Sequence, residues 1–168
     1  MAVAKKFVAL DTNFVLDLGG REPSSTLILD ALQNRGFSAI VTPTVVFEIA
    51  HFASHPKEDC HEDAKIAVAG LLGWKVTPIP LPPLQNGFVE LFSEYVRAEG
   101  LLGSAERNDG KILAEASLLG ATYLITTGDI AKIDRFLLKA AYEDKHLRPV
   151  DVVDKKIMLE LMRIKLSA

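Results

Sequence analysis

Residues 104–129 constrain the fold more than any other part of the sequence, because they combine a helical pattern, a turn and a short buried strand. Apolar residues recur at helical spacing until Gly120, which stands where a left-handed helix end is expected. The β-forming run 123–127 then stops just before Asp129. In open α/β sheets, chemistry collects beyond the carboxyl ends of the strands. We therefore expect Asp129, and Asp109 in the first turn of the helix, to face one functional edge.

The remainder of the chain alternates β-forming runs with amphipathic helical segments. The expected strands are 7–10, 39–41, 123–127, an edge segment within 75–80 and a short last strand at 148–150. The expected helices are 24–36, 43–52, 64–72, 88–98, 109–119, 130–142 and 153–166. Alternation of this kind is typical of a parallel sheet covered on both faces. The fold class predicted is α/β, a three-layer α/β/α sandwich with a central parallel sheet.

A length of 168 residues with 49% hydrophobic residues suits a single domain with its own core. We assign residues 1–150 to the α/β domain and residues 151–168 to a basic amphipathic helix packed on it. The single cysteine, Cys60, excludes an internal disulfide. No apolar run approaches the ~18 residues of a membrane span, and the start of the sequence does not resemble a signal peptide. We therefore expect a cytoplasmic protein without a membrane partner.

Four acidic residues fall at positions that this topology brings to one edge. Asp11 follows the first strand, Glu48 lies within an apolar helix, and Asp109 and Asp129 flank the central segment. An Asp after a strand is also a common helix N-cap, so Asp11 alone has a second interpretation. Carboxylates that converge repel each other, and a divalent cation relieves the repulsion. Oxygen ligands favour Mg²⁺ or Mn²⁺, which can activate water at a phosphoryl group.

The segment 51–63 gathers three histidines, a cysteine and several acids. Its spacing matches no common zinc template. We interpret it as a solvated connector, with a zinc site as the alternative.

At this point the sequence resembles the PIN-domain ribonucleases, which include the toxins of VapBC toxin–antitoxin systems. The resemblance rests on four motifs in order: Leu10-Asp11-Thr12-Asn13, Glu48 within residues 43–49, Asn108-Asp109, and residues 124–129 ending in Asp129. It covers residues 7–134. It implies a PIN-like fold, with residues 1–150 as the nuclease domain.

The resemblance further implies metal-dependent endonucleolytic cleavage of RNA, with Mg²⁺ or Mn²⁺ as cofactor. It implies that Asp11, Glu48, Asp109 and Asp129 are both the catalytic and the metal-binding residues. Thr12, Asn13 and Thr127 match supporting polar residues. An antitoxin protein and a second copy of the chain, forming a homodimer, are the partners implied besides RNA.

Two other functions fit parts of the pattern. Asp11 with the later acids resembles the haloacid-dehalogenase-like phosphatases, but that motif expects an acid where Asn13 stands, and it leaves Glu48 and Asp109 without a role. A non-catalytic PIN-like scaffold that binds RNA or protein is the third hypothesis, and the four intact acids argue against it.

The formal net charge of −3 argues against a protein that coats nucleic acid by bulk electrostatics. Attraction for RNA must then come from basic residues close to the site. Arg107 and Lys111 flank Asp109, and Lys132 and Arg135 follow Asp129. We predict that these four contact RNA phosphates, the alternative being that they are ordinary solvated helix charges.

Overall fold

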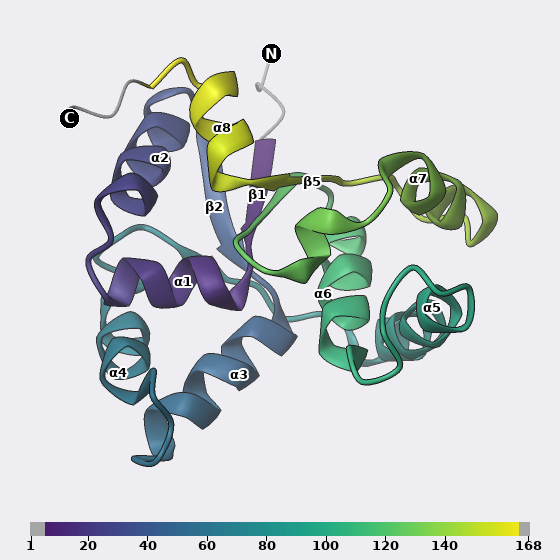
Figure 1. Cartoon of the computed structure of the whole chain (residues 1–168), viewed down its shortest axis with the longest axis horizontal. Coiled ribbons are helices and arrows are strands. Elements are labelled where there is room, and N and C mark those ends of the chain that lie inside the picture. Colours follow the sequence, from purple (N-terminus) through teal and green to yellow (C-terminus); the bar gives the residue numbers. More distant parts are fainter. Residues whose placement is uncertain (1–5, 165–168) are drawn as a thin grey trace.

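The computed structural model describes residues 6–164 and contains a five-stranded parallel sheet in the order β3-β2-β1-β4-β5 (Figure 1). The strands are β1 (Lys6–Leu10), β2 (Phe37–Val41), β3 (Thr77–Pro78), β4 (Ala121–Thr126) and β5 (Asp151–Asp154). Every adjacent pair is parallel. The proline-containing β3 lies at the edge, as expected for a residue that cannot donate a backbone hydrogen bond.

Helices cover both faces of the sheet. They are α1 (Thr12–Gly19), α2 (Pro23–Asn34), α3 (Pro43–Ser54), α4 (His61–Gly70), α5 (Asn86–Ala98), α6 (Arg107–Leu118), α7 (Arg135–Asp144) and α8 (Lys155–Leu161), with short 3₁₀ turns η1 (Pro83–Gln85) and η2 (Asp129–Lys132). Figure 1 shows α1, α2 and α4 on one side of the strands and α5, α6 and α7 on the other. The predicted three-layer α/β/α sandwich is confirmed. Within residues 6–164, no helix combines the length and apolarity needed to cross a membrane.

The three central strands form the middle of the core. Residues 8–10 of β1, 39–41 of β2 and 124–126 of β4 are buried without interruption. Continuous burial replaces the alternating pattern because helices lie against both faces of the sheet. The left-handed helix end predicted at Gly120 is also present, with φ at +72° directly before β4.

The C-terminal segment differs from the prediction. The last strand covers Asp151–Asp154 instead of 148–150, and α8 begins at Lys155 instead of Val153. Val152 and Val153 are buried against the sheet, and the Asp154 side chain accepts a hydrogen bond from the Ile157 amide at 2.7 Å, which fixes the helix start. Residues 151–154 therefore belong to the sheet, and the C-terminal helix begins only after them. Lys165 and Leu166 of the predicted helix lie outside the described residues.

The helix predicted over 130–142 is also divided. Residues 129–132 form η2, and α7 begins at Arg135. The Asp134 carboxylate accepts hydrogen bonds from the amides of Phe136 and Leu137 at 2.8 and 3.0 Å, so it caps a new helix.

Helices α5 and α6 pack closely at Gly110, the residue after Asp109. A Cβ atom at Gly110 would lie 2.7 Å from Ser93 Oγ and 2.9 Å from Ser93 Cα. Because Cα belongs to the backbone of α5, rotation of a side chain cannot relieve this contact.

We predict that Gly110→Ala lowers the free energy of unfolding by about 1–3 kcal/mol, because α5 must move away from α6. The matched control is Gly87→Ala, since a Cβ on this α5 residue meets nothing within 4 Å. It should be neutral or slightly stabilising. Urea denaturation of both variants measures the difference, and equal stability would contradict the packing described.

Candidate functional site

Asp11 lies at the carboxyl edge of the sheet, between the ends of two central strands. It follows β1 directly, and its backbone amide donates to the Ile125 carbonyl of β4 at 2.9 Å. Its side chain is 3% exposed and acts as the N-cap of α1. One carboxylate oxygen accepts from the Thr12 amide at 2.7 Å and the other from the Thr126 hydroxyl at 2.6 Å. Burial raises the pKa of Asp11 to about 6, although these hydrogen bonds oppose the shift.

Glu48 connects three helices at the same edge. It is half-buried on α3, and one of its oxygens accepts a hydrogen bond from the Thr12 hydroxyl of α1. The other oxygen accepts from the side-chain amide of Asn108 on α6, at 2.7 Å. Both oxygens of Glu48 are thus oriented by neighbours that the fold supplies.

Asp109 is the common neighbour of the other acids. It lies half-buried in the first turn of α6. Burial, together with the nearby charges of Asp11, Glu106, Glu48 and Asp129, raises its pKa to about 7. Positions 11, 48, 109 and 129 therefore share one electrostatic environment. Glu106, which sequence analysis did not single out, belongs to it as well.

Asp129 lies on the exposed side of this environment. Its side chain is 65% exposed on η2, and one oxygen forms an ion pair with Lys132 Nζ at 2.5 Å. Because the pair is solvent-exposed, it is readily exchanged for another cation.

The supporting polar residues divide into those that contact the acids and those that do not. Thr12 contacts Glu48, whereas Asn13 is exposed, with its amide nitrogen 2.8 Å from where a Cβ on Gly128 would lie. Thr127 is exposed, and the preceding Thr126 contacts Asp11 instead. Thr126 is the last residue of β4 and its hydroxyl reaches Asp11, whereas Thr127 already lies beyond the end of the strand.

Two of the predicted RNA-binding residues are engaged elsewhere on the surface. Arg107 Nη2 and Lys111 Nζ both pair with Glu90 of α5, at 2.8 and 2.7 Å. Lys132 pairs with Asp129, and Arg135 is exposed at the start of α7. All four cations lie on the helices that carry or follow the acids.

The side chains of the cluster suit a hard divalent cation in their chemistry. Carboxylate oxygens are the ligands that Mg²⁺ and Mn²⁺ prefer, and the raised pKa of Asp109 reflects burial and then the negative charge of the neighbouring acids. Across residues 6–164, no three His, Cys, Asp or Glu side chains are grouped as they would be around a bound metal ion. The acids instead accept hydrogen bonds or ion pairs from Thr126, Thr12, Asn108 and Lys132.

The histidines of the segment 51–63 are occupied by local contacts. The rings of His51 and His55 lie with their centroids 3.9 Å apart and their planes tilted by 32°. His55 Nδ1 lies 2.7 Å from the His51 carbonyl oxygen, and His61 Nδ1 lies 3.0 Å from that of Phe52. These contacts hold the connector between α3 and α4 against the end of α3.

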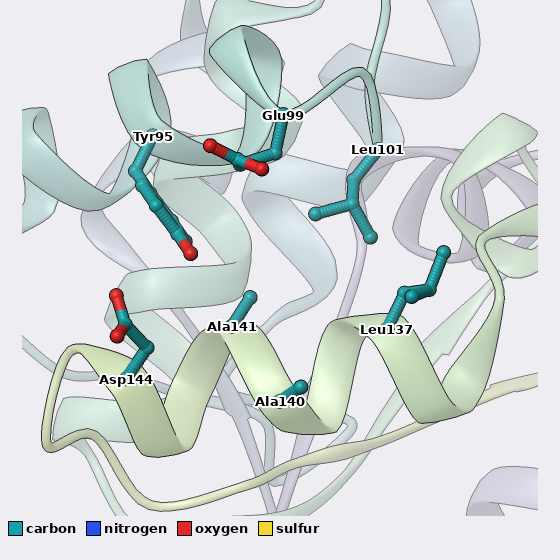
Figure 2. A pocket seen from close by; sticks show the side chains of 7 residues that line it. All are labelled: Tyr95, Glu99, Leu101, Leu137, Ala140, Ala141 and Asp144. Atoms are coloured by element: carbon teal, nitrogen blue, oxygen red, sulfur yellow. The ribbon is translucent and has the colours of Figure 1, made fainter.

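A separate hollow lies between α5 and α7 and contains none of the four acids (Figure 2). Its volume is about 390 Å³. Leu101, Leu137 and two alanines supply apolar lining, and Figure 2 shows Glu99 and Asp144 flanking Tyr95. Two of these residues already interact with Lys145. Its ammonium group lies 2.7 Å from the Asp144 carboxylate and 3.9 Å from the centroid of the Tyr95 ring.

Comparison with known proteins supports the fold. Neither a family model nor a curated protein matches the sequence. Among solved structures, the chain is similar to one in the crystal structure of VapBC2 from Rickettsia felis bound to a DNA fragment from their promoter. The two share 15% sequence identity over 88% of this chain and 98% of that chain, with a TM-score of 0.59. The likeness shows a PIN-like α/β/α fold.

The pKa values of Asp11 and Asp109 predict how stability depends on pH. Both rise from 3.8, to about 6 and about 7, so the folded state binds more protons than the unfolded state between about pH 4 and 7. Without added divalent cations, stability should therefore fall as pH rises through this window. We expect Asp109→Asn to be about 1–3 kcal/mol more stable than the wild type at pH 8, and the gain to vanish near pH 4.

Urea denaturation in chelator at the two pH values measures this effect. Glu58→Gln removes an equal charge from the exposed connector and serves as the control. A gain of the same size in both variants would show that net charge, rather than the buried cluster, is responsible.

Proposed function

We propose that the protein is a metal-dependent PIN-type ribonuclease that cleaves phosphodiester bonds of single-stranded RNA. The observation that carries the proposal is the shared environment of Asp11, Glu48, Asp109 and Asp129 at the carboxyl edge of a parallel sheet. Burying mutually repelling carboxylates at a strand end lowers the stability of the fold. Groups with strongly perturbed pKa values are concentrated at functional sites.

In this proposal the four carboxylates hold Mg²⁺ or Mn²⁺. When bound, such an ion supplies a more acidic water and stabilises negative charge on the phosphate. Asp11 is kept in place by Thr126 and the Thr12 amide, and Glu48 by Thr12 and Asn108. Asp109, whose anion is destabilised by burial, lies in the first turn of α6, near the positive end of that helix.

The basic residues would guide the RNA backbone. Lys132 is exposed and pairs with Asp129, and Arg135 is exposed at the start of α7, while Arg107 and Lys111 would exchange Glu90 for phosphate oxygens. This exchange explains how a chain of net charge −3 can bind a polyanion locally.

The proposal includes a role as the toxin of a toxin–antitoxin pair in the cytoplasm, acting as a homodimer. The similar structure is of VapBC2, and the resemblance of the sequence motifs points to the same systems. The partner of this chain would accordingly be an antitoxin protein.

A phosphatase of the haloacid-dehalogenase-like class is the alternative enzyme. Such an enzyme would use Asp11 as a nucleophile. Here Asp11 is 3% exposed, and both of its oxygens accept hydrogen bonds, which leaves little access for a substrate phosphorus. The buried Asp11 suits a ligand or an electrostatic role better than a nucleophile.

The first test concerns the metal. Mn²⁺ should stabilise the protein against thermal unfolding, by about 2.7 kcal/mol at an ion concentration a hundred times Kd. Asp11→Asn combined with Asp109→Asn should abolish the shift. The control, Glu58→Gln with Asp59→Asn, changes the charge equally on the connector. Stabilisation that survives the first pair but not the second would move the ion to the segment 51–63.

The second test concerns the reaction. Single-stranded RNA should be cut in Mn²⁺ or Mg²⁺ and left intact in excess chelator, and Asp109→Asn should lower the rate at least about a hundredfold. A small phosphomonoester should be hydrolysed poorly under the same conditions. Rapid phosphomonoester hydrolysis with intact RNA would favour the phosphatase instead, and metal binding without either reaction would favour the scaffold.

A further inference from the structure

Glu115 is a buried acid outside the carboxylate cluster, on the part of α6 that faces the start of α3. Its side chain is 5% exposed. One carboxylate oxygen accepts from the Thr44 hydroxyl at 2.7 Å and the other from the Thr44 backbone amide at 3.0 Å. Each oxygen therefore has its own donor, and these hydrogen bonds oppose the rise in the pKa of Glu115 that burial causes.

These contacts supply a cap that α3 lacks in its own sequence. The N-cap residue Thr42 makes no side-chain capping hydrogen bond, and Pro43 has no backbone N–H to offer. Thr44 is therefore the first residue of α3 that can donate a backbone hydrogen bond. Glu115, which lies on another helix, accepts this bond. The positive end of α3 also favours a negative charge at this place.

The same two helices contact each other at a second point, through Asn108 and Glu48. Thr44 and Glu48 are four residues apart on α3, and Asn108 and Glu115 are seven apart on α6, so each pair lies on one face of its helix. The contacts run in opposite directions along the two helices, and in Figure 1 α3 begins next to α6 and then leads away from it. Together they fix both the separation and the register of α3 and α6.

We propose that Glu115 is a positioning residue, which caps α3 from α6 and thereby places Glu48 against Asn108 and Asp109. The structural part of this inference stands independently, and its consequence for catalysis rests on the proposed ribonuclease function. Glu115 itself contacts none of the four acids in the hydrogen bonds of the described chain. Its effect on them must pass through the two helices.

The test compares Glu115→Ala with Ser117→Ala. Ser117 is also buried on α6, and its hydroxyl donates to the Arg148 carbonyl at 2.6 Å, so Ser117→Ala removes a buried hydrogen bond of α6 without touching α3. The first readout is the NMR signal of the Asn108 side-chain amide in chelator, since this amide donates to Glu48. Glu115→Ala should shift the signal and speed its hydrogen exchange, whereas Ser117→Ala should do neither.

The second readout is affinity for Mn²⁺, followed by kcat and KM on single-stranded RNA. We expect Glu115→Ala to raise the Kd for Mn²⁺ about tenfold or more and to lower kcat more than it changes KM. Glu115→Gln should restore most of both, because its amide can accept from the Thr44 amide and donate to the Thr44 hydroxyl. Thr44→Val, which removes the hydroxyl alone, should act in the same direction with a smaller effect, and it serves if Glu115→Ala does not fold.

An Asn108 signal and a Mn²⁺ affinity that both stay at wild-type values in Glu115→Ala and Thr44→Val would overturn the positioning role. Equal changes in Ser117→Ala would overturn it too, because they would indicate general loosening of α6. If the wild type neither binds Mn²⁺ nor cuts RNA, the proposed function fails, and the Asn108 signal alone still decides whether Glu115 positions α3.

Discussion

Electrostatic repulsion among carboxylates at one edge of the sheet is the constraint on which the rest of this structure depends. Parallel pairing brings the ends of β1, β2 and β4 to the same edge, so acids that follow those strands meet there. The fold opposes the repulsion with donors taken from neighbouring elements, such as Thr126 for Asp11 and Asn108 for Glu48. Asp109 is compensated least, because no described side chain or backbone amide donates a hydrogen bond to its carboxylate, so nothing opposes the rise in its pKa that burial and the neighbouring acids cause. The least stabilised acid is thus the one surrounded by all the others.

The donors also explain how the helices are held around this edge. Glu48 receives hydrogen bonds from α1 and α6, and Glu115 of α6 caps α3, so two acids bind three helices to one another. Close packing at Gly110 then fixes α6 against α5. A site of repelling charges requires a rigid frame of this kind. On mobile segments the charges would move apart, whereas rigid helices keep them close enough to bind one counter-ion.

Much of this arrangement could be predicted from sequence because the signals are local. Apolar runs such as 7–10 and 39–41 predicted the strands, and the order of acids after them predicted which residues share an edge. Thr127 was predicted in place of Thr126, because the choice depends on the exact end of the strand, which the sequence pattern does not define. The roles of Glu106 and Glu115 could not be predicted, because the role of an acid on a helix depends on the residues that pack against it. The final strand was misplaced by three residues because Pro149 and the β-branched Val152 and Val153 give conflicting signals.

Asp11 shows why a structural role and a functional role need not exclude each other. The interpretation as a helix N-cap is correct, since its side chain accepts from the Thr12 amide, and yet the same carboxylate lies in the electrostatic environment of Asp109. An N-cap requires only a short side chain with an acceptor oxygen, and Asn serves about as well as Asp. A negative charge at this buried position is therefore more than the cap requires. Because burial raises the pKa of Asp11 to about 6, the charge costs stability that Asn would avoid. Position 11 thus carries an acid although Asn would give a more stable fold. This is the physical reason to expect a cation at this edge.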